Sequence, residues 1–198
     1  MAKGKLIVFE GIDGAGSTTQ LKLFGKYLAK KKIKFVETCE PTDGPIGKLI
    51  RKALRHELKF SWETLQLMYS GDRADHLDKI IKPNLERGVN VISDRYFLST
   101  FAYGELNLDG KWLRGLNRKF LPADITFYID TPADVAISRI KKTRGEKELF
   151  EKKKFLENVR KNYLKIAREF GNSIHVLSGT LPMERIAKEV VSIFENDK

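Results

Sequence analysis

The hydrophobic positions of this chain alternate between short continuous runs and longer segments with helical spacing. Short continuous runs are typical of strands that are buried on both faces of a parallel sheet. The runs that we expect to form strands are residues 6–9, 35–36, 89–93, 125–129 and 174–177. Between them, apolar residues three and four positions apart predict helices. The expected helices cover about 18–32, 45–56, 61–87, a segment from 97, then 111–121, a segment from 133, about 155–170, and a segment from 182.

Strands that alternate with helices favour parallel crossovers, in which helices cover both faces of one sheet. The chain has 198 residues, enough for a sizeable core, and no repeat, low-complexity tract or linker divides it. We therefore predict a single domain over residues 1–198, of the α/β class, with a five-stranded parallel sheet flanked by helices.

The composition, 41% hydrophobic and 32% charged, is that of an ordinary globular protein. No apolar run approaches the roughly 20 residues that span a bilayer. Acidic Glu10 follows soon after the first residues, so we expect neither a signal peptide nor a membrane segment. Cys39 is the only cysteine, which excludes an internal disulfide and predicts a cytoplasmic location.

The formal net charge of +11 draws anions, either nucleic acid or small phosphorylated ligands. The basic clusters are residues 30–34, 48–55, 141–147 and 152–154. Nearly every cluster has apolar neighbours at helical spacing, so we interpret most of these lysines as solvated helix faces. No segment resembles a groove-reading helix or a sheet of stacked aromatics, and nucleic acid is the least favoured partner.

A glycine-rich segment joins the first expected strand to the first helix. It consists of Gly11, Ile12, Asp13, Gly14, Ala15, Gly16, Ser17, Thr18 and Thr19. Gly11, Gly16 and Thr18 match the P-loop, in which two glycines five apart precede Lys and then Ser or Thr. Backbone N–H groups of such a loop wrap a phosphate, and the helix N-terminus adds partial positive charge. The sequence therefore predicts a nucleotide phosphate site, with the Thr18 hydroxyl available to Mg²⁺.

Ser17 stands where the P-loop has its lysine. That lysine normally reaches the β- and γ-phosphates as a point charge, whereas serine is neutral and too short to reach them. Removing one preorganised donor from such a site costs about 10²–10³ in rate. We expect a penalty of this size unless another cation substitutes.

Several further motifs follow in order along the chain. They are Phe9 to Gly16, Glu40-Pro41, Asp72-Arg73, Asp94-Arg95-Tyr96, Ser99-Thr100, Ala102-Tyr103, Arg139 to Gly145, and Ser178-Gly179. In their order and spacing the chain resembles the thymidylate kinases, nucleoside monophosphate kinases with the P-loop nucleotide kinase fold, over nearly its whole length. The resemblance implies phosphoryl transfer from MgATP to dTMP, giving dTDP and ADP, by a homodimer.

Asp94 and Arg95 end the third expected strand, where α/β proteins place ligand-handling side chains. An arginine at this position can hold two phosphates through its planar fork. The resemblance implies that Arg95 contacts both the acceptor phosphate and the transferred phosphoryl group, and that Asp94 orders the Mg²⁺ shell. It also implies that Asp13 lies near the acceptor sugar and the metal.

Tyr69 and Arg73 are four residues apart and would share one face of a helix. The resemblance implies that Tyr69 stacks on the pyrimidine while Arg73 hydrogen-bonds its polar edge. Ser99 and Tyr103 repeat this spacing, and the family places Tyr103 beside the deoxyribose, where its ring would reject a 2′-hydroxyl. Pro41 completes the implied substrate site.

The stretch from 139 to 151 is polar and dense in charge. By resemblance it is a lid over ATP, in which Arg139 and Arg144 stabilise the transferring phosphate. Leu149 occupies a position where the bacterial members often have a second lid arginine. Lys22, Lys141, Lys142 and Lys147 are candidates to replace the missing charge.

Two alternatives stay open at the level of the sequence. Ser17 and Leu149 would suit a nucleotide-binding paralogue with weak or no dTMP kinase activity. Cys39 and Gly104 stand where the family often has Arg and Gln, which would suit a kinase for another nucleoside monophosphate.

Overall fold

The computed structural model describes residues 3–140 and 146–197, except for the side chains of 146–151. The strands are β1 (Leu6–Glu10), β2 (Phe35–Cys39), β3 (Asn90–Asp94), β4 (Ile125–Asp130) and β5 (Ile174–Ser178). They form one sheet in the order β2-β3-β1-β4-β5, and every neighbouring pair is parallel. The predicted five-stranded parallel sheet is thus confirmed.

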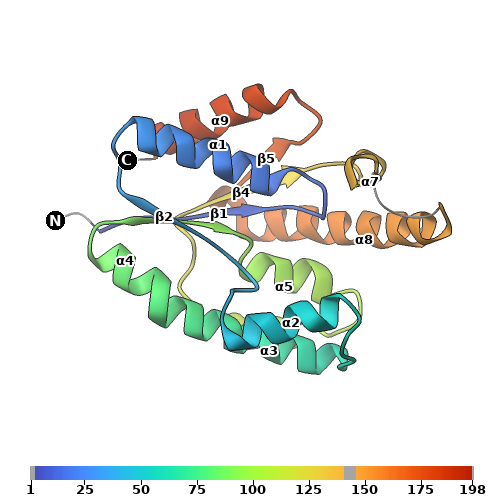
Figure 1. The fold of residues 1–198 in the computed structure, drawn as a ribbon. Helices are drawn as coiled ribbons and strands as arrows, with labels where there is room; N and C mark the ends of the chain where they lie inside the picture. Colours follow the sequence, from blue (N-terminus) through green and yellow to red (C-terminus); the bar gives the residue numbers. More distant parts are fainter. Residues whose placement is uncertain (1–2, 141–145, 198) are drawn as a thin grey trace.

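Helices cover both faces of this sheet (Figure 1). On one face lie α1 (Ser17–Lys30) and α9 (Met183–Asn196), which pack side by side. On the other face lie α4 (Lys82–Glu86), α5 (Phe97–Gly104) and α8 (Glu146–Phe170). The outer elements on that side are α2 (Pro45–Leu54), α3 (Trp62–His76) and α6 (Gly110–Asn117). Helix α7 (Ala133–Ile140) packs against α8, and a 3₁₀ turn, η3 (Gly171–Ser173), precedes β5.

The helical stretch predicted between Ser61 and Arg87 is continuous but changes its winding. Helix α3 passes into a π-helical turn, η1 (Leu77–Ile81), which passes into α4. The π turn directly precedes the first turn of α4, where Pro83 lacks the N–H that would continue an α-helical ladder. Ser61 caps α3 as predicted, because its side chain accepts a hydrogen bond from the Thr64 N–H. The helix predicted over 111–121 ends earlier, at Asn117.

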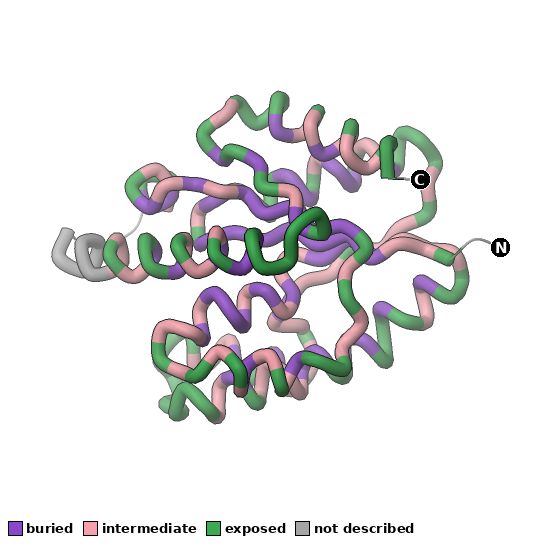
Figure 2. Tube along the Cα trace, turned by 180° about the vertical axis from the view of Figure 1, so that it is seen from behind, coloured by how far each residue is buried: buried purple, intermediate pink, exposed green. Residues whose placement is uncertain are grey.

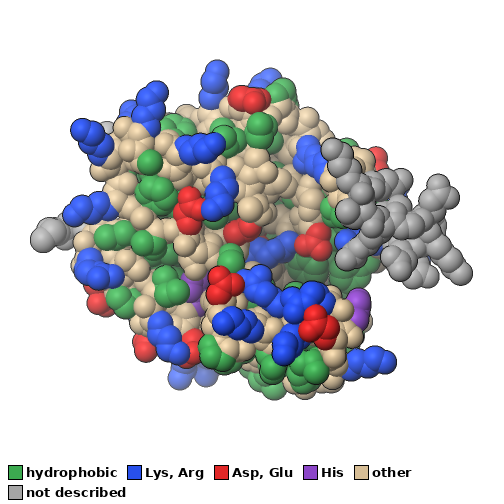
Figure 3. Space-filling model, viewed as in Figure 1, with side chains coloured by type: hydrophobic (Ala, Val, Ile, Leu, Met, Phe, Trp, Pro, Cys, Tyr) green, Lys and Arg blue, Asp and Glu red, His purple; other side chains and the backbone are tan. Residues whose placement is uncertain are grey.

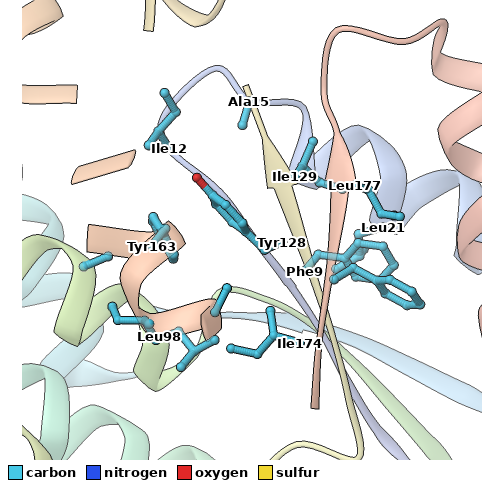
Figure 4. Close-up of a cluster of buried hydrophobic side chains, with 14 of the residues drawn as sticks. Phe9, Ile12, Ala15, Leu21, Leu98, Tyr128, Ile129, Tyr163, Ile174 and Leu177 are labelled. Atoms are coloured by element: carbon cyan, nitrogen blue, oxygen red, sulfur yellow. The ribbon is translucent and has the colours of Figure 1, made fainter. Parts of the chain in front are cut away.

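The core holds the loop that follows β1 in place. Buried residues follow the strands and the inward sides of the helices (Figure 2). Ile12 and Ala15, both in the loop, are buried and belong to the same cluster as Phe9, Tyr128 and Ile129 (Figure 4). Two apolar anchors therefore fix a loop in which Asp13, Thr18 and Thr19 are exposed.

The carboxyl ends of β1 and β3 form a crevice. These strands are neighbours, with Phe9 opposite Asp94. The chain leaves β1 for α1 on one face of the sheet and leaves β3 for α5 on the other face (Figure 1). Ligands of open α/β sheets bind at such a divergence. The glycine-rich loop and Arg95 thus start on opposite sides of one crevice.

Candidate active site

The loop from Gly11 to Thr19 has a backbone shaped for an anion. Gly14 and Gly16 have φ angles of 81° and 100°, which side chains rarely adopt. The carbonyl oxygen of Ala15 accepts hydrogen bonds from Thr131 Oγ1 at 3.1 Å and from Arg139 Nη1 at 2.9 Å. These two donors fix the orientation of that peptide from outside the loop.

A cavity of about 600 Å³ lies over this loop. Its walls are Ile12, Asp13, Gly14, Gly16, Ser17, Thr18, Thr19, Asp94, Arg95, Arg139, Ile140 and Lys152. Helix α1 begins in the cavity wall at Ser17, and no side chain caps its first turn. Uncapped N–H groups at a helix N-terminus bind anions, since the helix dipole adds to their partial charge. The cavity therefore suits nucleotide phosphates.

A second cavity of about 680 Å³ meets the first, because Thr18 and Asp94 line both. The second cavity continues along β2 and the start of α2, past Cys39 and Thr42. Figure 3 shows the viewed face hollowed near its centre, with basic and acidic side chains around the hollow. Two anionic substrates would meet where Thr18 and Asp94 lie.

The hydroxyls of Ser17 and Thr18 both donate hydrogen bonds to Asp94, the former at 3.2 Å. Hydroxyl and carboxylate oxygens are ligands that Mg²⁺ accepts, and nucleotide sites often supply only one or two protein groups beside the phosphates. Within the described residues, no group of three or more His, Cys, Asp or Glu could hold a metal ion. Thr18 and Asp94 therefore fit a Mg²⁺ ion that arrives with a nucleotide.

Arg95 occupies the centre of the crevice in a strained conformation. Its φ angle is 72°, a left-handed value that costs a non-glycine residue roughly 1–2 kcal/mol. Its guanidinium donates to Asp13 at 2.8 Å and to Ser99 at 3.1 Å, and it lies 5.3 Å from the ring centre of Tyr103. Residues with such strain cluster at functional sites. The geometry joins the loop residue Asp13 to the side chains of α5.

Two tyrosines flank this arginine. Burial raises the pKa of Tyr69 to about 12 and the pKa of Tyr103 to about 12, and for both side chains Arg95 lowers the pKa while Asp13 raises it. The hydroxyl of Tyr103 lies 3.4 Å from Asp13 Oδ1. Both phenols therefore stay neutral near pH 7. The structure thus brings together five predicted site residues: Asp13, Tyr69, Arg95, Ser99 and Tyr103.

Arg73 is held apart from that group. It is buried, and its guanidinium donates to Glu40 at 2.8 Å, to Thr100 at 3.2 Å and to Asn117. It also lies 5.3 Å from the ring centre of Tyr96. Glu40, Thr100 and Asn117 thus fix the side chain in one orientation at the back of the crevice. No local pattern in the sequence identifies these three partners.

Arg51 of α2 lies beside Cys39, the residue that stands where the family often has Arg. Its Nη2 lies 3.6 Å from the sulfur of Cys39, 3.2 Å from Asp43, and within hydrogen-bonding distance of the Pro41 carbonyl oxygen. Pro41 is therefore tied to a guanidinium beside the second cavity. The sequence analysis did not identify Arg51 as a site residue.

Arg139, at the end of α7, bridges two loops. Its second guanidinium nitrogen donates to the carbonyl oxygen of Gly179 at 2.8 Å, in addition to the bond with Ala15. It thus lies between the phosphate loop and the loop after β5. Arg144 and the candidates Lys141 and Lys142 fall outside the described residues. The side chains of Lys147 and Leu149 do as well.

Comparison with known proteins agrees with this geometry. The family model for thymidylate kinase matches residues 9–190. The chain belongs to the thymidylate kinase family. It is 38% identical to a probable thymidylate kinase of Thermococcus kodakarensis, over 96% of each chain. It is 36% identical to one of Methanocaldococcus jannaschii, over 99% of this chain and 98% of the relative. It is 35% identical to a thymidylate kinase of Nitrosomonas eutropha, over 98% of this chain and 94% of the relative.

The predicted resemblance is therefore confirmed, and with it the P-loop kinase fold. None of the helices within 3–140 and 146–197 combines the length and apolar composition needed to cross a bilayer.

Glu10 is a residue of this thymidylate kinase site that the sequence analysis did not assign. It is buried at the end of β1 and accepts hydrogen bonds from the Ser99 hydroxyl at 2.6 Å, the Tyr163 hydroxyl at 2.8 Å and the Tyr96 N–H at 2.9 Å. Burial raises its pKa, against the opposing effect of the nearby Arg95 charge. The sequence feature that could have identified Glu10 is its place as an acidic residue at the end of an otherwise apolar strand.

Lys22, a candidate to replace the missing P-loop charge, forms an ion pair outside the phosphate cavity. Its ammonium pairs with Glu37 of β2, and this contact raises the lysine pKa. Both residues line the second cavity and not the phosphate cavity. Lys22 therefore does not replace the P-loop lysine in this conformation.

Proposed function

We propose that this chain transfers the γ-phosphoryl group of ATP to dTMP, giving ADP and dTDP. The observation that best supports this proposal is the position of Arg95, which lines the phosphate cavity and is hydrogen-bonded to Asp13 and Ser99. A guanidinium at this point can bind the acceptor phosphate and the transferred phosphoryl group at once. Membership of the thymidylate kinase family favours dTMP as the acceptor and a kinase over a non-catalytic paralogue.

Positioning and electrostatics suffice for this reaction. A phosphate monoester has its second pKa near 6, so the acceptor is mostly dianionic at pH 7 and needs no general base. Backbone N–H groups of the loop hold the donor phosphates, and Arg95 holds the two phosphates in line. Thr18 and Asp94 would hold Mg²⁺, which neutralises phosphate charge when it is bound.

The side chains around Arg95 supply acceptor specificity in this proposal. In this proposal Tyr69 stacks on the base. One of the remaining N–H groups of Arg73, whose guanidinium is held by Glu40, Thr100 and Asn117, donates to the polar edge of the base. A site that hydrogen-bonds one base rejects analogues that leave its buried donors unpaired. Tyr103 would lie beside the sugar, where its half-buried ring would leave no room for a 2′-hydroxyl.

The test is ADP formation by the purified chain with MgATP and each of dTMP, dUMP, dCMP, dGMP and dAMP, with Ser17→Lys assayed in parallel. We expect dTMP to be the preferred acceptor of both proteins. A parent rate comparable with that of Ser17→Lys would mean that another cation replaces the lysine, and would exclude the weak paralogue. A faster rate with another acceptor would favour the alternative specificity. Tight ATP binding without transfer to any acceptor would contradict the kinase proposal.

We also infer a homodimer, as the family resemblance implies. Exposed hydrophobic side chains on α2, α3 and the connection between them support it. Its test is given at the end of the Discussion.

A further inference from the structure

The phosphate cavity lacks the charge of the usual lysine. Three cations line it within the described part of the chain, and two of them are already engaged. Arg95 pairs with Asp13 at 2.8 Å. Arg139 donates to two backbone carbonyl oxygens. The third cation that lines the cavity is Lys152, near the start of α8.

Lys152 belongs to the inward face of α8. Residues 152, 156, 159 and 163 are spaced by four, three and four, so they form one stripe along the helix. Leu156, Val159 and Tyr163 on this stripe are all completely or almost completely buried. Lys152 extends the same stripe one turn further, beyond the end of the core and over the phosphate cavity.

The direction of this stripe is fixed by contacts with the rest of the site. Tyr163 donates to Glu10 at 2.8 Å and stacks on Tyr128 with ring centres 4.7 Å apart. Phe155, three residues after Lys152, contacts the ring of Tyr103 with centres 6.0 Å apart. Rotation of α8 away from the cavity would break these contacts, so Lys152 is held at the cavity wall.

The neighbouring lysines behave differently. Lys153 pairs with Glu157 on its own helix, at 4.0 Å, and Lys154 is exposed two residues further round the helix. Among the described residues, none forms an ion pair or hydrogen bond with the ammonium of Lys152. A lysine at a phosphate cavity that has no counter-ion among the described side chains is suited to bind an anionic ligand.

We propose that Lys152 binds the β- and γ-phosphates of the nucleotide and supplies the charge that Ser17 does not. The inference rests on the proposed function only in taking ATP as the donor. The cation thus comes from α8 and not from the loop. An ammonium is a point charge on a flexible stem, so it can serve the same phosphate oxygens from the other side of the cavity.

The test compares Lys152→Ala with the matched control Lys154→Ala, each with Ser17 and with Ser17→Lys. In the Ser17 background we expect Lys152→Ala to lower kcat/KM for ATP by about 10²-fold, the typical cost of one lost phosphate donor. We expect Lys154→Ala to change it by less than about threefold. In the Ser17→Lys background Lys152→Ala should cost less than about tenfold, because the loop lysine restores the charge.

ATP affinity without dTMP, measured by calorimetry, separates this inference from the proposed function. Weaker ATP binding by Lys152→Ala, with a thermal midpoint equal to that of Lys154→Ala, would support the role of Lys152 even if the parent does not phosphorylate dTMP. Equal ATP affinity and equal kcat/KM for the two alanine variants would overturn it. So would an equal loss in both backgrounds, because that would point to a structural role for Lys152.

Discussion

Single residues of this site combine features that the sequence predicts with features that depend on distant partners. The four-residue spacing of Tyr69 and Arg73 correctly predicted one helix face. However, the partners that fix Arg73 stand 33 and 44 residues away, at Glu40 and Asn117. The sequence likewise placed Arg95 at a strand end but did not predict its left-handed backbone. Local pattern thus finds candidate chemistry, while long-range contacts determine its geometry.

The backbone strain at Arg95 predicts that two substitutions with the same loss of activity differ in stability. Arg95→Ala and Arg95→Gly both remove the guanidinium and should lower kcat by about 10³-fold or more, the value of a transition-state arginine. Arg95→Gly should nevertheless be more stable than Arg95→Ala by about 1 kcal/mol, because alanine is strained at a positive φ and glycine is not. Urea denaturation of the two variants measures this difference. Equal stabilities would contradict the strain at this position.

At the level of helices and strands, continuous apolar runs predicted the strands, because a parallel strand that is buried on both faces is apolar at nearly every position. Several helical details were not predicted. Among them are the π turn at Leu77–Ile81, the end of α6 at Asn117, and the start of α8 at Glu146, inside the charged stretch that we expected to be a lid. Lys152 could have been found from the sequence, because its spacing to Leu156 and Val159 places it on their face. The adjacent lysines concealed it, since runs of charge usually mark solvated helix faces.

Glu10 connects three elements, because it accepts hydrogen bonds from residues of α5 and α8 at the end of β1. Burial raises its pKa above 4.5 in the folded chain. The folded state then binds this proton more tightly than the unfolded state, so the contribution of Glu10 to stability decreases as pH rises above 4.5. Glu10→Gln removes this titration while keeping an acceptor oxygen.

We therefore expect the stability of the parent relative to Glu10→Gln to fall as pH rises above 4.5, as measured by urea denaturation at increasing pH. Glu57→Gln is the control. Arg55 lowers the pKa of exposed Glu57, so that residue contributes a small stabilisation that is lost as pH falls. A difference between the parent and Glu10→Gln that does not change with pH would show that Glu10 is not held with a raised pKa.

For the whole molecule, charge and hydrophobic exposure point to two kinds of partner. The net charge of +11 attracts anionic nucleotides. The exposed large hydrophobic residues are concentrated in one region of the described chain. Six of ten lie between residues 49 and 67: Leu49, Leu54, Leu58, Phe60, Trp62 and Leu67. Figure 3 shows hydrophobic side chains along the lower edge of the molecule, where Figure 1 places α2 and α3. A concentrated apolar surface of this kind marks a protein interface.

The inferred homodimer predicts that a charge on this surface separates the subunits. Leu67 is 52% exposed on α3, so Leu67→Glu should leave the fold intact while burying an unpaired carboxylate in the interface. Met183→Glu is the matched control, since Met183 is 45% exposed at the start of α9, on the opposite face of the sheet. Sedimentation equilibrium should give twice the chain mass for the parent and for Met183→Glu, and one chain mass for Leu67→Glu. A monomeric parent would contradict the homodimer.

Helix α3 also carries Tyr69 and Arg73, so the inferred interface and the proposed base site share one element. Separating the subunits should therefore raise the KM for dTMP more than the KM for ATP, because the phosphate cavity contains no residue of α3. Steady-state kinetics of Leu67→Glu with each substrate varied in turn measures the two constants. An equal rise in both would mean that the interface supports the whole fold, whereas a rise confined to dTMP would show that the partner subunit holds α3 in its substrate-binding position.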